Sequence, residues 1–232
     1  MNGIEEFTLN RRRMLGGGAA GLALLALPGC VGGVGGLSLT EVIRRLLLRS
    51  TENAFARLTA PDGYWDDQVA RLGLSNLLGT RGDVLSRILT STLFKDRLED
   101  AFADIAIEGS YVAAPIVRDA VEAIGWQNAL ELVRGGPTAA STALRGELGM
   151  TLVDAMVPEL GDAIRIASDP LVGELINAAT GTNVAGIAQR LSGTIDDAVW
   201  TEIGREEAAI RADPEATGDP LLISVFGVGA RI

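Results

Sequence analysis

The sequence predicts an all-α protein, a single bundle of about eight helices that follows an export signal and a glycine-rich tether. Hydrophobic residues make up 47% of the 232-residue chain, whereas aromatic residues make up only 4%. That balance is typical of helices rich in Leu, Ala, Val and Ile that pack on one another. Apolar residues recur at helical spacing, and no stretch shows the alternation of a strand. A chain of this length can bury a core of its own.

The first helix is expected to begin after Ser38, where a capping box with Glu41 satisfies the first backbone amides. It should end at the turn Pro61-Asp62-Gly63, because proline and glycine interrupt helices. Apolar residues on one side of this helix recur at the spacing of a buried face. They are Leu39, Val42, Ile43, Leu46, Leu47, Ala54 and Leu58.

Prolines and glycines suggest where the middle helices begin and end. We expect one long helix over 83–107 and a second over 110–124, with Pro115 in its first turns or at a kink. A further helix over 142–157 should stop before Pro158, because the residue before a proline disfavours helical geometry.

The last long helix is expected over 195–212. Thr194 would be its N-cap, and Asp213-Pro214 would end it. Glu207 and Arg211 stand four residues apart on this helix and should form an ion pair.

Charge and residue usage exclude several classes of function. The net charge of −10 argues against a nucleic-acid groove, which needs basic side chains to displace counterions. The chain has no histidine, so Ser-His-Asp and Cys-His nucleophile systems are excluded, as are zinc sites built on imidazole. It has one cysteine and one lysine. No cofactor is predicted. What remains for an enzyme is carboxylate chemistry, a site built on Tyr, Ser, Thr or Arg, or a metal held by oxygen ligands.

Residues 1–29 read as an export signal. Arg11 and Arg12, followed by Met14-Leu15, look like a twin-arginine export motif. The apolar stretch behind them is weakly hydrophobic, as such signals are, and is far shorter than the ~20 apolar residues that a spanning helix needs.

Cys30 directly follows the signal and is the last residue of Leu27-Pro28-Gly29-Cys30, which resembles a lipobox. We expect acylation of Cys30 and membrane anchoring through the acyl chains, each buried CH₂ adding ~0.8 kcal/mol. The alternative is an ordinary signal whose cysteine is incidental. Val31 follows Cys30 in place of an inner-membrane retention aspartate, so the sequence favours a periplasm-facing lipoprotein of the outer membrane. Residues 30–37 form the tether, and residues 38–232 form the body.

The loop Asp62-Gly63-Tyr64-Trp65 is a candidate binding loop because it joins aromatic and acidic side chains. Asp62, Asp66 and Asp67 could instead offer oxygen ligands to a cation. In a third interpretation, Tyr64 and Trp65 plug the end of the bundle while the acids cap the next helix. The longer acidic ladder and closing glutamate of a calcium loop are missing, so no metal site is predicted.

A candidate anion corner lies at Gly135, Gly136 and Thr138, where bare amides at a helix N-terminus could hold an anion. Pro137 would take the first helical position. The alternative is a tight corner between two helices. The segment lacks the Gly-Lys-Ser/Thr of a nucleotide loop, and no strand precedes it.

Three stretches together resemble an uncharacterised bacterial family, DUF4197. They are Asp62-Gly63-Tyr64-Trp65, Gly135-Gly136-Pro137-Thr138-Ala139-Ala140-Ser141, and Glu206 to Pro214 with Leu221-Leu222 and Val225-Phe226-Gly227. The chain departs from the family at Pro137, where an acid is usual. The resemblance implies an all-α exported protein, often with a signal peptide, and implies no activity.

The sequence favours a non-catalytic binding or scaffolding module, with an unknown protein or an apolar, lipid-like ligand as its partner. The alternative is a carboxylate-based enzyme of unknown substrate. Carboxylates that converge in a pocket would favour the enzyme, and carboxylates spread over the surface would favour the binding module. Two groups of residues are the candidates for such an enzyme. One is Asp62, Asp66 and Asp67 near Tyr64, and the other is Glu206 and Glu207 with Arg211.

Overall fold

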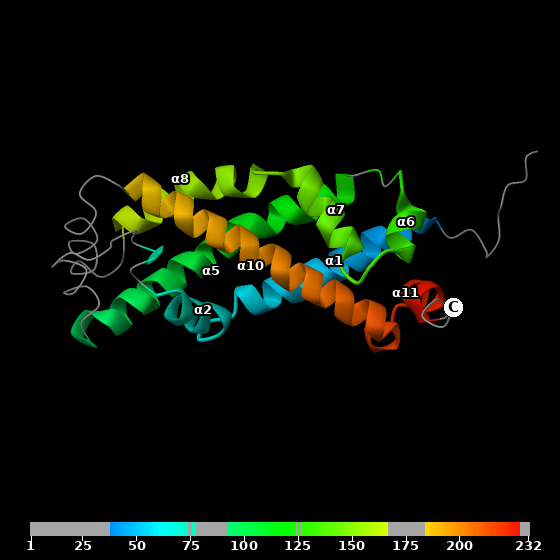
Figure 1. Ribbon diagram of the computed structural model, residues 1–232, viewed down its shortest axis with the longest axis horizontal. Helices are drawn as coiled ribbons and strands as arrows, with labels where there is room; N and C mark the ends of the chain where they lie inside the picture. The colour runs from blue at the N-terminus through cyan, green and yellow to red at the C-terminus, as the bar shows by residue number, and fades with distance from the viewer. Residues whose placement is uncertain are drawn as a thin grey trace, which may run out of the picture. The chain divides into compact units, whose positions relative to one another are not determined.

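The structure is a computed structural model that describes residues 38–73, 76–77, 92–123, 125, 127–166 and 184–227. The elements bounded within these residues are eight α-helices, a 3-10 helix and a π-helical turn, without a strand (Figure 1). The predicted all-α fold is therefore confirmed. All of these elements belong to one compact unit, Leu37–Ile232.

Four long helices form the frame: α1 (Leu39–Leu58), α5 (Thr92–Ala123), α8 (Thr151–Ile166) and α10 (Val184–Ala212). Helix α10 packs against both α1 and α8, and α5 packs against the same two helices (Figure 1). None of the helices in the described ranges is long and apolar enough to cross a bilayer. The shorter elements are α2 (Tyr64–Leu72), α6 (Ala129–Arg134), α7 (Ala139–Leu148), η1 (Pro214–Thr217), α11 (Pro220–Leu222) and η2 (Ile223–Gly227).

The core is built on the apolar side of α10, which faces the other long helices. Burying each large aliphatic side chain there contributes roughly 1.5–3 kcal/mol. Its buried members are Val184, Ile187, Leu191, Ile195, Val199, Ile203 and Ile210. As far as Ile203 they recur every three or four residues, and Ile210 follows two turns later, so one side of the helix enters the core.

Gly109 lies where α5 passes close to α8 and α10. A Cβ atom at this position would come within 2.5 Å of the Ile195 Cδ1 atom and 3.1 Å of a Leu160 methyl group. Glycine is therefore present because the helices meet too closely for a side chain. The predicted break near residue 109 is wrong, since α5 continues through it.

Two prolines lie inside helices, although the sequence suggested a boundary at the second of them. Pro115 is inside α5 and Pro158 is inside α8, so the predicted stop before Pro158 is wrong. Both prolines are on the exposed side of their helix. Each removes one backbone hydrogen bond. On the exposed side, water can reach the freed carbonyl, which limits the destabilisation.

The predicted helix over 142–157 is in fact divided. Helix α7 ends at Leu148, and α8 begins at Thr151. Gly149 makes the break with a φ of +53°, a left-handed conformation that glycine adopts readily.

Helix α10 begins at Val184, well before the predicted start at Ile195, so Thr194 is not its N-cap. The Thr194 hydroxyl donates to the Arg190 carbonyl at 3.1 Å. This bond satisfies the hydroxyl inside the helix, where it cannot serve as a cap. The predicted end before Asp213 is correct.

Helix α1 has Ser38 at its N-cap, as predicted, but the Ser38 side chain makes no capping bond. Glu41 instead binds Arg44 at 2.9 Å and Arg45 at 3.1 Å. The helix ends at Leu58, just before the predicted turn. The predicted helix start at residue 83 lies outside the described residues.

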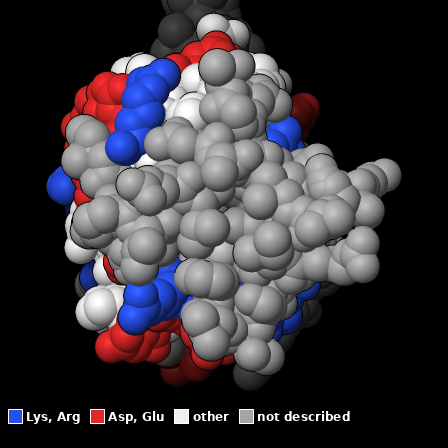
Figure 2. All heavy atoms as spheres, turned by 90° about the vertical axis from the view of Figure 1, so that its left-hand side faces the viewer, with Lys and Arg blue, Asp and Glu red and all other residues white. Residues whose placement is uncertain are grey.

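Charged side chains of both signs are mixed on the face seen in Figure 2, which turns the left-hand side of Figure 1 toward the viewer. Among the described residues visible there, acidic and basic groups lie beside one another. Local ion pairs such as Lys95–Glu99 at 3.5 Å and Arg165–Asp162 at 2.6 Å show the same mixing.

Candidate functional site

The Trp65 side chain is completely buried against α5. Its indole Nε1 donates to the Ser110 hydroxyl at 3.1 Å, and that hydroxyl donates to the Ala106 carbonyl at 2.9 Å. A buried tryptophan needs such a partner for its N–H group. Trp65 is thus a core residue that joins α2 to α5, and its ring is closed to solvent.

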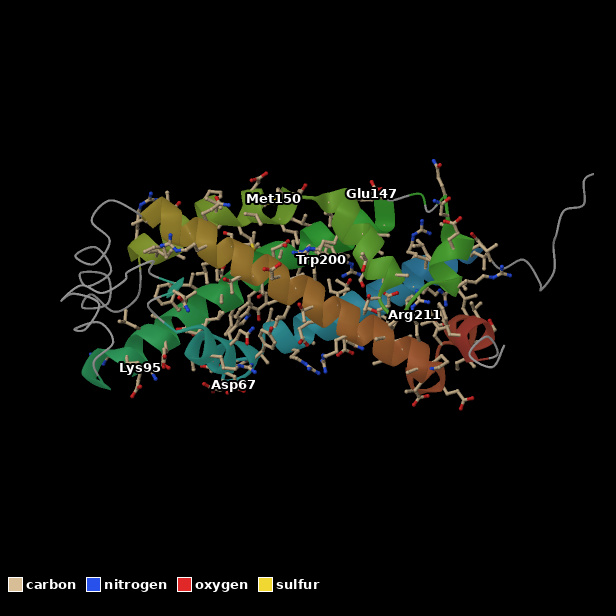
Figure 3. All side chains as sticks on the ribbon, in the orientation of Figure 1. Asp67, Lys95, Glu147, Met150, Trp200 and Arg211 are labelled. Carbon is tan, nitrogen blue, oxygen red and sulfur yellow. The ribbon has the colours of Figure 1, made fainter. Side chains whose placement is uncertain are left out.

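The acids around this loop do not converge. Asp62 has a φ of +51° in the turn, and a Cβ at Gly63 would lie 3.1 Å from the Ala60 carbonyl oxygen. Asp66 and Asp67 stand in the first turn of α2, where the helix dipole favours negative charge. Asp67 points away from the bundle (Figure 3). In the described ranges, no three acids are grouped so that they could hold a metal ion.

Tyr64 is half-buried and packs edge-on against Trp65, with ring centroids 5.1 Å apart. Burial raises the pKa of the Tyr64 hydroxyl, and the Glu202 carboxylate on α10 raises that pKa further. Tyr64 therefore stays protonated at neutral pH.

Glu202 and Glu206 lie between two arginines where α1 meets α10. Arg57 is 3.3 Å from Glu202 and 3.6 Å from Glu206. Arg205 is 3.0 Å from Glu202 and 2.6 Å from Glu206. Two guanidinium groups thus neutralise the two carboxylates, one of which, Glu206, the sequence offered as a catalytic candidate.

The predicted anion corner contains an anion from the chain itself. The backbone amides of Ala140 and Ser141, in the first turn of α7, donate to the Glu207 carboxylate at 3.0 and 2.7 Å. Thr138 is the N-cap but makes no side-chain capping bond, so Glu207 takes that role. Pro137 precedes the helix rather than occupying its first position, which corrects the sequence prediction.

Arg211 completes this corner. Its guanidinium binds Glu207 at 2.7 Å, donates to the carbonyls of Leu132 and Val133 at 2.9 and 3.0 Å, and lies 4.8 Å from the centre of the Phe226 ring. The predicted Glu207–Arg211 pair is confirmed. The Glu207 side chain is 0% exposed and that of Arg211 is 9% exposed, so the pair is buried. We call Glu207, Arg211, the α7 amides and the α6 carbonyls the buried corner.

Two hollows adjoin each other on α1. The polar hollow, about 460 Å³, lies between α1 and the turn before α11. The apolar hollow, about 310 Å³, lies between α1 and α5. Leu48 and Glu52 line both, so the hollows meet there. The polar hollow is also lined by Arg45, Arg49, Thr217, Gly218, Asp219, Pro220 and Leu222, and the apolar hollow by Thr51, Phe55, Ala114, Pro115 and Arg118.

A family described as a protein of unknown function, DUF4197, matches residues 34–227. The chain belongs to this family. The match includes all three stretches on which the resemblance was based. Neither the curated proteins nor the solved structures contain a match.

In this DUF4197 chain, two of the three family stretches meet in space. Ala140 and Ser141 come from the glycine-rich stretch, and Glu207, Arg211 and Phe226 come from the C-terminal one. Sequence reasoning identified both stretches but not their contact. The signals that could have revealed it were a bare helix N-terminus and an acid beside an arginine on an apolar helix face.

Sequence reasoning missed the hollows, because their walls come from three distant segments of the DUF4197 domain. Of the predicted sites, the structure places Tyr64 near Glu202 and places Glu207 at the α7 amides, but it does not group Asp62, Asp66 and Asp67. Cys30, Arg11 and Arg12 lie outside the described residues, so their roles remain sequence predictions.

Proposed function

We propose that this DUF4197 protein is a non-catalytic binding module, exported through Arg11 and Arg12 and held at the periplasmic face of the outer membrane by acyl chains on Cys30. The export and anchoring parts rest on the sequence motifs. The binding part rests on one observation, the pair of adjoining hollows on α1. Each hollow falls in the size range of small-molecule sites, which are concave and few per protein.

The state of the candidate catalytic acids supports binding over catalysis. A general acid or base must exchange a proton with its substrate and so must reach it. Glu207 is fully buried, and its carboxylate is occupied by two amides and Arg211. Glu206 is bridged by Arg57 and Arg205. Neither acid lines either hollow.

Site-specific photo-crosslinking in living cells tests the binding role. A photoreactive apolar amino acid replaces Leu48, which lines both hollows, and in a control replaces Asp162 on the exposed side of α8. We expect a discrete adduct at position 48, whose mass identifies the bound species, and none at position 162. Equal labelling at both positions, or no adduct at position 48, would contradict the proposal.

Intact mass of membrane-extracted protein tests the anchor. The unaltered chain should begin at Cys30 and carry the mass of several acyl chains, and Cys30→Ser should carry none. An unaltered chain without acyl mass rules the anchor out.

Replacing Arg11 and Arg12 by Lys tests the export route. It should leave unprocessed precursor in the cytoplasm, and normal processing would exclude twin-arginine export.

A further inference from the structure

We infer that the two hollows on α1 together bind one zwitterionic phospholipid, with its headgroup in the polar hollow and an acyl chain in the apolar hollow. The inference rests on the proposed binding function and names the chemical class of its ligand. The two hollows differ in chemistry but meet at Leu48 and Glu52, so one amphiphilic molecule can lie across both.

The apolar hollow suits an acyl chain. Its lining includes the apolar side chains Leu48, Phe55 and Ala114 and the ring of Pro115. Tyr111 stands four residues before Pro115, one helical turn away on α5, and is 56% exposed. It extends the apolar surface beyond the hollow, where a chain could continue.

Thr51 lines the apolar hollow and has a hydroxyl without a hydrogen-bond partner. The residue is 4% exposed, and the hydroxyl itself is closed to solvent. Buried polar groups are nearly always paired, so an unpaired one calls for an explanation. Rotation about χ1 would turn the hydroxyl toward the hollow. The ester carbonyl that joins an acyl chain to its headgroup would then accept from it.

The polar hollow has balanced charges. Arg45 and Arg49 contribute two positive charges, and Glu52 and Asp219 contribute two negative ones. The Arg45–Asp219 bridge of 3.2 Å joins the two walls, while the Arg49–Glu52 pair is looser, at 3.9 Å, and about half exposed. A phosphate beside Arg49 and an ammonium beside Glu52 would complement this pair. A headgroup of one sign would leave one side chain unmatched.

The tether would keep the body close to such lipids. Seven residues, 31–37, separate Cys30 from Ser38. Fully extended, the eight residue steps from Cys30 to Ser38 span at most about 29 Å. An acylated Cys30 would therefore hold the start of α1 within that distance of the membrane.

Calorimetric titration of the full chain carrying Cys30→Ser tests the inference. The probes are lysophosphatidylethanolamine, lysophosphatidylglycerol and monoacylglycerol, each with a myristoyl chain. We expect the zwitterionic probe to bind about tenfold more tightly than the other two. Equal binding of all three, tightest binding of the anionic probe, or no binding would overturn the inference.

Three variants locate the site. Thr51→Val keeps the shape of the side chain and removes the hydroxyl, so affinity should fall about fivefold while the thermal midpoint stays equal or rises. Thr142→Val, on the exposed side of α7, is its control and should change neither quantity. Glu52→Gln leaves the polar hollow with a net positive charge and should shift preference toward the anionic probe. Unchanged affinity in Thr51→Val, or unchanged preference in Glu52→Gln, would contradict the inferred pose.

The two proposals fail separately. If an adduct forms at position 48 in cells but the protein does not bind the zwitterionic probe most tightly, the phospholipid inference fails and the binding function stands. If no adduct forms at position 48, the binding function fails, and the inference fails with it.

Discussion

The buried corner and the polar hollow each contain an arginine and a glutamate close in sequence, yet the two pairs differ in exposure. Glu207 and Arg211 are 2.7 Å apart and buried. Arg49 and Glu52 are 3.9 Å apart and more than half exposed. A buried pair is fixed because its separated charges would lack solvation. An exposed pair contributes little and can rearrange. Exposure thus separates a structural pair from one that is free to meet a ligand.

The largest expected effect is at the buried corner. Glu207→Ala leaves Arg211 buried without its partner and leaves two α7 amides unsatisfied, so the free energy of unfolding should fall by about 3–5 kcal/mol. Urea unfolding followed by circular dichroism measures this change. Glu122→Ala on α5 removes an exposed partner of Arg118 at 3.5 Å and should cost less than about 0.5 kcal/mol.

Two outcomes would break the comparison. A loss below about 1 kcal/mol in Glu207→Ala would mean that water replaces the carboxylate at the corner. A loss in Glu122→Ala as large as that in Glu207→Ala would mean that exposure does not determine how much an ion pair contributes to the free energy of unfolding.

Two glycines extend the comparison, because Gly109 lies in closely packed surroundings and Gly193 has open space around it. Gly109→Ala should destabilise the protein by about 1–3 kcal/mol, because its Cβ would meet Ile195 and Leu160. Gly193→Ala inside α10 meets nothing within 4 Å and should stabilise by about 0.5–1 kcal/mol, since alanine favours helix. Thermal unfolding of both variants should shift in opposite directions. Equal shifts would contradict the close crossing at Gly109.

The smallest effect concerns Asp219, at the edge of the polar hollow. Burial opposes its ionisation, but hydrogen bonds from the Leu221 amide and from Arg45 outweigh burial and lower the pKa of Asp219. Because the folded state lowers this pKa, the ionised carboxylate stabilises the fold at neutral pH. That contribution should be lost as the pH falls below about 4 and through the folded-state pKa.

Asp219→Asn should therefore cost about 1 kcal/mol at pH 7 and much less at an acidic pH below the folded-state pKa, where the carboxylate of the unaltered protein is protonated. Urea unfolding at both pH values measures the difference. Asp162→Asn, which removes the exposed pair with Arg165, should cost less at pH 7. A loss in Asp219→Asn that is the same at both pH values would show that the charge does not matter.

The fold class could be predicted because apolar residues recur at helical spacing along the sequence. Helix boundaries were less predictable, because tertiary contacts overrode local signals. Pro115 and Pro158 lie on exposed faces where helices tolerate them, and Gly109 serves a close crossing rather than a break. Local signals do mark other ends: Gly149, with its left-handed φ, ends α7, and α10 ends just before Asp213.

The candidate sites, like the helix boundaries, depended on tertiary contacts that local signals do not show. The sequence offered a candidate anion corner at Gly135, Gly136 and Thr138, with a tight corner between two helices as the alternative. Only the fold shows that Glu207 binds the amides of Ala140 and Ser141. The interpretation of Trp65 as a plug matches its buried ring, whereas no local signal marks the hollows. Such sites depend on which distant segments come together, and a single sequence does not state that.

The pairing of α1 with α10 has a consequence for the order of events during synthesis. Asn53 and Arg57 meet Glu206 and Glu202, about 150 residues later in the chain. At ~5–20 residues per second, a ribosome needs roughly ten to thirty seconds to make that partner after α1 emerges. Throughout that interval the apolar side of α1 lacks its main cover. The nascent chain should therefore depend on a holding chaperone until its last long helix is complete.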